Sequence, residues 1–186
     1  MTTAPIIESG MTFGPYPQGQ CFYIEKSECY ARIQEGVQMA EFLLLKKNGN
    51  TASVVWVVEA KSSSPQQISG AKPKSKFKFA FDEYIEDIRV KLTNAFLLIV
   101  ATRLDRQPNG QDELPVPFKT LNLSQTNFKF VLVIREHREE WLPPLQDALT
   151  LAFKPVKKTW GLPAMSVAVL NEDLAKTHGL ILQPSK

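Results

Sequence analysis

The chain has 186 residues, of which 44% are hydrophobic and 22% are charged. These proportions are typical of a globular protein and exclude disordered and collagenous classes. At about 150 residues per domain, the length predicts one domain whose core needs no disulfide bonds. The net charge of +3 neither requires nor excludes a nucleic-acid partner. No apolar run approaches the roughly 18 residues of a membrane span, and the first residues lack the pattern of a secretory signal.

Cysteine and histidine are scarce. The only cysteines are Cys21 and Cys29, and the only histidines are His137 and His178. Their spacing offers neither the four clustered ligands of a structural zinc site nor a Cys-His or Ser-His catalytic arrangement. Two isolated thiols fit a reducing compartment, so we expect a cytoplasmic protein in which both cysteines are small buried hydrophobic residues.

The predicted elements begin after an irregular lead-in. Residues 1–20 are rich in Pro, Gly and Thr and are predicted to be irregular, followed by a single domain over residues 21–186. Residues 21–25 form a short predicted strand. Ser27 is expected to cap a helix that runs to about residue 34.

The clearest local signal is a hairpin. Residues 41–47 (EFLLLKK) and 52–61 (ASVVWVVEAK) are apolar enough for strands, and Asn48-Gly49 between them favours a tight turn. The second strand does not alternate until its end, which indicates that both of its faces are covered. A loop is predicted over residues 62–76.

The remaining elements alternate between helix and strand. Apolar residues at helical spacing predict a long helix over residues 79–103. The later elements are a strand at 128–135, a helix at about 143–153, a strand at 164–170 and a final helix capped by Asn171 and ending before Gly179. The expected fold is therefore an α/β domain whose mixed sheet starts with an antiparallel hairpin and is flanked by helices.

Charged residues end the apolar hairpin. Glu59 and Lys61 share one face at the end of the second strand, about 6 to 7 Å apart, and Glu41 opens the first strand. Two carboxylates and the Ala60 backbone carbonyl are hard oxygen ligands that suit Mg²⁺ or Mn²⁺. Such an ion would polarise a phosphodiester, and Lys61 would orient a water molecule or stabilise developing negative charge.

The segments AEFLLL (40–45) and VVWVVEAK (54–61) resemble the PD-(D/E)XK nuclease superfamily, also called restriction-endonuclease-like. The resemblance covers roughly residues 27–135. It implies an α/β core with a helix, an acidic hairpin, a crossover helix and a further strand. It also implies that Glu59 and Lys61 are the (D/E)xK pair, that Glu41 replaces the family aspartate, and that Glu28 is an additional helical acid. Ala40-Glu41 stands where the family usually has Pro-Asp.

The hairpin register tests this interpretation. A two-residue turn at Asn48-Gly49 would place Glu41 opposite Trp56, on the sheet face away from Glu59. A loop of odd length, or one bulge, would bring all three charges to the same face. The nuclease hypothesis therefore predicts an odd loop or a bulge. The alternative is that Glu59 and Lys61 only solubilise the strand end as a surface pair, worth about 0 to 1 kcal/mol.

Lysines supply a second candidate feature. In an extended loop, alternating lysines could follow a phosphate backbone, and Gln66 is a weaker candidate for nucleic-acid contact. A solvated loop is the alternative for this segment. A second basic cluster with an aromatic residue is either a stacking platform or a surface loop. The alternating lysines of the loop are Lys72, Lys74, Lys76 and Lys78. The second basic cluster consists of Lys154, Lys157, Lys158 and Trp160.

These features together predict a metal-dependent nuclease that hydrolyses DNA or, as the second choice, RNA, with Mg²⁺ or Mn²⁺ as cofactor. We expect no membrane partner, and a homodimer or a protein complex is compatible with the sequence. Two alternatives stay open: an inactive nuclease-like module for binding or assembly, and a nuclease subunit that acts only within a defence or repair complex.

Overall fold

The computed structural model describes residues 1–48, 52–65 and 75–181. Its centre is a five-stranded mixed sheet in the order β3-β4-β5-β6-β7, antiparallel from β3 to β5 and parallel from β5 to β7. This arrangement confirms a mixed sheet that begins with an antiparallel hairpin. The strands are β3 (Cys21–Phe22), β4 (Phe42–Asn48), β5 (Ala52–Lys61), β6 (Asn127–Ile134) and β7 (Val167–Asn171).

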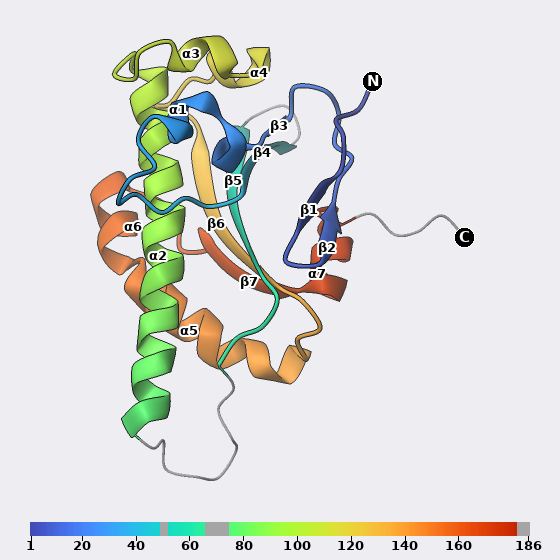
Figure 1. The fold of residues 1–186 in the computed structure, drawn as a ribbon, viewed down its shortest axis with the longest axis vertical. Coiled ribbons are helices and arrows are strands. Elements are labelled where there is room, and N and C mark those ends of the chain that lie inside the picture. Colours follow the sequence, from blue (N-terminus) through green and yellow to red (C-terminus); the bar gives the residue numbers. More distant parts are fainter. Residues whose placement is uncertain (49–51, 66–74, 182–186) are drawn as a thin grey trace.

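Helices that connect the parallel strands cover one face of the sheet (Figure 1). α2 (Ser75–Arg103) links β5 to β6, and α5 (Leu142–Ala152) with α6 (Lys154–Trp160) links β6 to β7. A parallel pair requires such a crossover because the chain must return to the end of the sheet at which the first strand began, and a tight turn is too short for this. Apolar side chains of α2 and α5 bury against those of β4, β5 and β6 in one cluster. Short helices complete this part: η1 (Ile24–Lys26), α1 (Glu28–Ala31), α3 (Gly110–Glu113), α4 (Val116–Lys119) and η2 (Glu139–Trp141).

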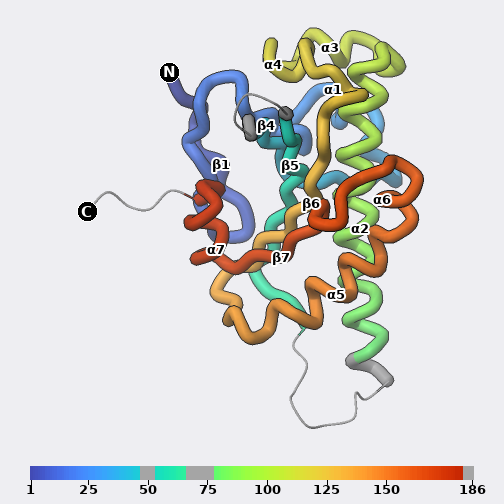
Figure 2. Tube along the Cα trace, turned by 180° about the vertical axis from the view of Figure 1, so that it is seen from behind, coloured from blue at the N-terminus to red at the C-terminus, as the bar shows by residue number. Residues whose placement is uncertain are grey.

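The prediction that residues 1–20 are irregular is wrong. They contain a hairpin of β1 (Ile6–Glu8) and β2 (Met11–Phe13), which packs with α7 (Glu172–Thr177) on the second sheet face (Figure 2). Ser9 and Gly10 form its two-residue loop, and both have the positive φ of 50° and 75° that such tight hairpin turns use. The Pro and Gly content therefore marks turns in this segment rather than a lack of structure.

β5 is covered on both faces, as its unbroken apolar run predicts. Val55 and Val57 belong to the cluster beneath α2, whereas Trp56 and Val58 belong to the cluster beneath the β1–β2 hairpin. The strand ends at Lys61, where the apolar run gives way to charge.

The hairpin register differs from that of a two-residue turn. Asn48 lies in β4 and pairs with Ala52, so three residues, 49–51, separate the two strands. The Asn48-Gly49 turn is therefore wrong, and the odd loop that the nuclease hypothesis requires is confirmed. Residues 49–51 themselves lie outside the described part of the chain.

Helix boundaries differ from the predictions in three places. The first helix covers only Glu28–Ala31, although Ser27 caps it as expected by accepting a hydrogen bond from Tyr30 N. α2 starts at Ser75 rather than at residue 79. The Lys and Phe residues between these positions are compatible with a helix, and the nearest proline in the sequence, Pro73, precedes them. α6 occupies a segment for which a surface loop was one of two interpretations.

Asn171 caps α7 through Leu174 N, and Gly179 follows the helix with a φ of 65°, both as predicted. Cys29 is buried, while Cys21 is only partly buried, and both are free thiols. Within the described residues, no helix combines the length and the apolar character needed to cross a membrane.

Candidate functional site

The end of β5 places Glu59 and Lys61 on the sheet face that α2 covers. Residues alternate between the two faces of a strand, so these two side chains follow Val55 and Val57 toward the helix. Glu59 is completely buried, whereas the Lys61 side chain is 25% exposed. A carboxylate therefore lies at the margin of an apolar core, with an amine beside it that reaches solvent.

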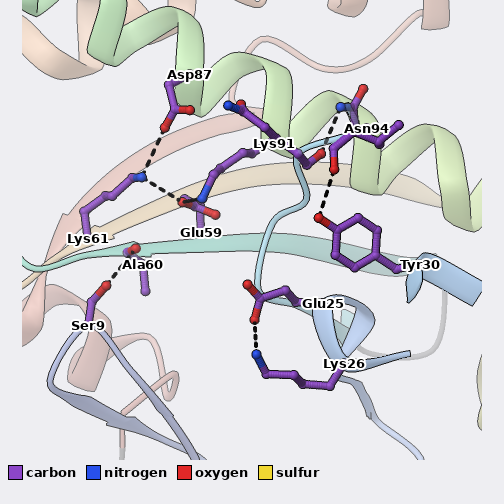
Figure 3. Close-up of polar contacts among 12 residues, drawn as sticks. Ser9, Glu25, Lys26, Tyr30, Glu59, Ala60, Lys61, Asp87, Lys91 and Asn94 are labelled. Carbon is purple, nitrogen blue, oxygen red and sulfur yellow. Dashed lines mark hydrogen bonds and ion pairs between the residues drawn. The ribbon is translucent and has the colours of Figure 1, made fainter. Parts of the chain in front are cut away.

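Two lysines hold the Glu59 carboxylate (Figure 3). Lys91 Nζ lies 3.0 Å and Lys61 Nζ lies 3.3 Å from Glu59 Oε1, and Lys61 Nζ also contacts Asp87 Oδ2 at 3.1 Å. Asp87 and Lys91 are four residues apart on α2, and this spacing brings both to the same side of the helix. Burial alone would lower the pKa of Lys91, but the adjacent Glu59 carboxylate raises it overall.

Glu41 lies in the bend just before β4. The β4–β5 register, in which Phe42 pairs with Val58, would place Glu41 opposite Glu59 when extended by one residue, and Glu41 N donates to Val58 O at 3.0 Å. Glu41 is only 6% exposed, and its buried Oε2 has no hydrogen-bond partner among the described residues. An unpartnered buried carboxyl is costly and calls for a physical explanation.

Two further acids converge on Glu41. Glu8 ends β1 and Glu25 lies in η1, and one carboxylate oxygen from each of Glu8, Glu25 and Glu41 lies within 4.8 Å of the others. One backbone and one side-chain hydrogen bond support this arrangement: Glu25 N donates to Glu41 O at 3.1 Å, and the hydroxyl of Tyr23 donates to Glu8 Oε1. The Glu25 carboxylate also forms an ion pair with Lys26 at 2.9 Å.

The N-terminal hairpin is attached to the site at its turn. Ser9 Oγ donates to Ala60 O at 3.0 Å (Figure 3). This contact holds the tip of the β1–β2 hairpin against the end of β5, and Glu8 is thereby brought to the sheet end that carries Glu41.

The electrostatics of the site are repulsive. Burial raises the pKa of Glu41 to about 8, and the nearby carboxylates of Glu59, Glu8 and Glu25 add to the increase, while Lys91 opposes it. Burial also raises the pKa of Glu59, against the attraction of its two lysines. Perturbed carboxyls of this kind are concentrated at functional sites.

A count of charge shows what would relieve this repulsion. The five carboxylates are those of Glu8, Glu25, Glu41, Glu59 and Asp87, and the lysines in contact with them are Lys26, Lys61 and Lys91. When all are ionised, five acids against three lysines leave an excess of two negative charges. A divalent cation with a preference for oxygen ligands matches both the charge and the chemistry of this donor set.

The predicted metal ligands are divided between two neighbouring groups. Glu41 lies with Glu8 and Glu25, whereas Glu59 is held by lysines. The Ala60 carbonyl already accepts the hydrogen bond from Ser9. Glu28 is exposed on α1, where its backbone N–H donates to Glu113 Oε2, and the structure does not bring it to this group.

The structure thus adds Glu8, Glu25, Asp87 and Lys91 to the candidate site. The sequence pattern assigns Asp87 and Lys91 to the polar face of a long helix, and Glu8 falls in a segment predicted to be irregular. A signal for Glu25 was available in principle, because it lies in the same stretch before the hairpin as the predicted acid Glu28.

The predicted nucleic-acid contacts fare differently. Lys76 and Lys78 lie within α2 rather than in an extended loop, so the alternation expected of an extended segment does not apply to them. Lys78 is exposed and forms an ion pair with Asp82. Gln66, Lys72 and Lys74 lie outside the described residues.

The second basic cluster is partly occupied by internal contacts. Lys157 Nζ donates to Ala164 O at 2.7 Å. The Trp160 ring packs edge-on against Phe96, with ring centroids 4.6 Å apart. Trp160 is nevertheless 42% exposed, so its outer edge is open to solvent.

A surface cleft opens beside Asp87. It has a volume of about 690 Å³ and lies between α2 and the chain that follows α1, and its lining includes Tyr30, Gln38, Glu83, Glu86 and Asp87. The acidic lining favours cations over phosphate at this approach to the site.

Comparison with known proteins adds no relative: the chain matches no protein-family model, no curated protein and no solved structure.

Proposed function

We propose that this protein is a Mg²⁺- or Mn²⁺-dependent nuclease that hydrolyses phosphodiester bonds of DNA, with RNA as the second substrate to test. One observation carries the proposal. A buried, unpartnered Glu41 lies among other carboxylates at the sheet end where the register also brings Glu59 and Lys61.

Each residue has a chemical role in this proposal. Glu8, Glu25 and Glu41 would hold the cation, and Glu59 would support it from the adjoining position. A bound divalent cation supplies Lewis-acid polarisation of the phosphodiester and lowers the pKa of a water molecule. Lys61 has three N–H donors and uses two of them in its contacts with Glu59 and Asp87. The third has no partner among the residues that the structure describes, and it would orient the attacking water or stabilise negative charge on the phosphorus oxygens.

The order of elements supports the same proposal. The resemblance to PD-(D/E)XK nucleases implies a helix, an acidic hairpin, a crossover helix and a further strand. This chain has α1, the β4–β5 hairpin, α2 and β6 in that order. Fold order alone does not establish activity, and the proposal therefore depends on the chemistry of the site.

The direct test is cleavage of DNA by the purified protein with Mg²⁺ or Mn²⁺. We expect Lys61→Ala to reduce the cleavage rate by roughly 100-fold or more, the range for loss of a group that stabilises transition-state charge. The matched control is Lys176→Ala, which removes a lysine whose ion-pair partner among the described residues is Asp173 on α7, and it should leave the rate unchanged. Undiminished cleavage by the Lys61 variant would exclude the assigned role.

Metal binding is tested separately from cleavage. Mn²⁺ should raise the melting temperature of the wild-type protein, because a ligand that binds only the folded state stabilises it. Glu41→Gln should abolish this increase. Because metal binding requires the deprotonated carboxylate, the increase should also be larger at about pH 8 than at about pH 6.

One observation favours an alternative. Glu59 is fully buried and already paired with two lysines, as in a site that serves structure. An inactive binding or assembly module should show neither cleavage nor a Mn²⁺-dependent increase in melting temperature. A subunit that cleaves only within a complex should show the increase without cleavage.

A further inference from the structure

A second charged cluster lies on the opposite face of the sheet. Lys46 of β4, Trp56 of β5 and Lys129 of β6 stand on three neighbouring strands. Trp56 pairs directly with Lys129, and Leu44, two residues before Lys46, pairs with Trp56. All three side chains therefore share the sheet face that carries the β1–β2 hairpin and α7, and the acids lie at the other end of β5.

Both lysines approach the same indole ring. Lys46 Nζ lies 4.2 Å and Lys129 Nζ lies 4.8 Å from the Trp56 ring centroid. Trp56 is only 8% exposed, and both lysines are partly buried. At the outer side of the cluster, the His178 ring meets the Trp56 ring edge-on, with centroids 5.8 Å apart.

The cluster has no balancing negative charge among the residues that the structure describes. Lys46 Nζ donates to His178 O, the carbonyl at the end of α7, which is a favourable position for a cation. Lys129, within the described part of the chain, contacts the indole ring and no acidic group. A cation–π contact contributes about 0.5 to 2 kcal/mol, and it does not remove the repulsion between two ammonium groups.

The pKa shifts in the cluster have the direction expected from this repulsion. Burial lowers the pKa of Lys46, and Lys129 lowers it further. Burial, Lys129 and Lys46 together lower the pKa of His178. Each group would therefore be stabilised in its charged form by an anion placed between the amines.

We propose that Lys46, Lys129 and His178 form a binding site for one phosphate group, with Trp56 as its apolar floor. The two ammonium groups would donate to the phosphate oxygens, and the His178 ring would donate from the exposed side. Charge-assisted hydrogen bonds of this type are the stronger ones in proteins. The site does not depend on the metal-dependent activity proposed above.

Trp56 provides the signal for the test. The chain has three tryptophans, so Trp141→Phe with Trp160→Phe leaves Trp56 as the only indole. Titration of this protein with inorganic phosphate in metal-free buffer should give a saturable change in fluorescence. Lys46→Gln and Lys129→Gln should each weaken phosphate binding roughly tenfold, about the value of one charge-assisted hydrogen bond.

The control is Lys119→Gln, which removes a partly exposed lysine on α4 whose Nζ, within the described residues, donates to Asp112 O. This variant should bind phosphate as the parent does. A fluorescence change that fails to saturate, or that survives both substitutions in the cluster, would overturn the proposal.

A second titration identifies the source of the phosphate. If the ligand is a nucleic-acid backbone, Lys46→Gln and Lys129→Gln should also weaken binding of a DNA oligonucleotide. Each should then reduce the salt dependence of DNA binding by about one phosphate contact. If DNA affinity is unchanged while inorganic phosphate binding is lost, the site takes a small phosphate or phosphate monoester.

Discussion

At the scale of single residues, Glu41 dominates the candidate site. Its buried Oε2 has no hydrogen-bond partner among the described residues, and its pKa is raised by burial first and then by three nearby carboxylates. Such a group opposes folding whenever it is ionised, because its charge is neither hydrated nor paired. A cation bound as proposed above would relieve this repulsion, because its charge is opposite to that of the carboxylates.

The pKa of Glu41 predicts how stability changes with pH. Its folded-state pKa of about 8 lies above the ordinary value of 4.5, so the folded state holds an extra proton between these values. The stability that this proton confers is complete below about pH 4.5 and is lost as the pH rises through about 8. The slope between them approaches about 1.4 kcal/mol per pH unit.

Glu41→Gln should remove this contribution. In urea unfolding without metal, its free energy of unfolding should fall less steeply between about pH 5 and about pH 8 than that of the wild type. Glu139→Gln changes an exposed acid of η2 and should keep the wild-type slope. Equal slopes in the Glu41 variant and the wild type would show that Glu41 is already ionised in the folded protein.

At the scale of elements, the β1–β2 hairpin is a structural layer and not an appendage. Phe13 of β2 is fully buried and packs edge-on against Phe42 of β4, with ring centroids 5.3 Å apart. Glu8 of β1 reaches the acidic group, while Ser9 anchors the hairpin turn to β5. Stability and the candidate site are therefore linked through this element.

Phe13→Ala should lower the free energy of unfolding by about 3 to 5 kcal/mol, the usual effect of removing a buried aromatic ring. Ile7→Ala on the same hairpin is the matched control, because Ile7 is 72% exposed and should change stability by only about 0.5 kcal/mol or less. Chemical denaturation of both variants measures the difference. A small effect at Phe13 would mean that the hairpin does not stabilise the sheet.

At the scale of the whole molecule, the two apolar clusters share β4, β5 and β6. Val57 and Val58, adjacent on β5, belong to different clusters, and both are fully buried. Loss of either cluster would expose one face of the same strands to water. We therefore expect the sheet and both covering layers to unfold together.

Two single-tryptophan proteins test this expectation. Trp56 belongs to the cluster under the β1–β2 hairpin, and Trp160 packs on Phe96 in the cluster under α2. For each protein that retains only one of these indoles, the unfolding midpoint measured by tryptophan fluorescence should equal the midpoint measured by far-UV circular dichroism. A separate fluorescence transition at either indole would show that one layer unfolds independently.

The strand and helix that form the centre of the fold were predictable because their signals are local. The run from Ala52 to Lys61 is too apolar for a surface strand, and it forms β5 with those bounds. The helical spacing of apolar residues predicts a helix that ends at Arg103, and α2 ends there. The alternation of side chains also made the hairpin testable in advance, because Glu41 and Glu59 share one face only if the loop has an odd length or a strand has a bulge.

The composition of the site was decided by tertiary structure. Glu8, Glu25 and Lys91 lie far from Glu59 in sequence, and no local period relates a side chain on α2 or β1 to one on β5. Their positions follow from how α2 and the hairpin pack on opposite faces of the sheet. Sequence by itself therefore determined which strand would end in charge. Only the packing of distant elements decided which acids and lysines would meet there, because that choice depends on the burial of the whole core.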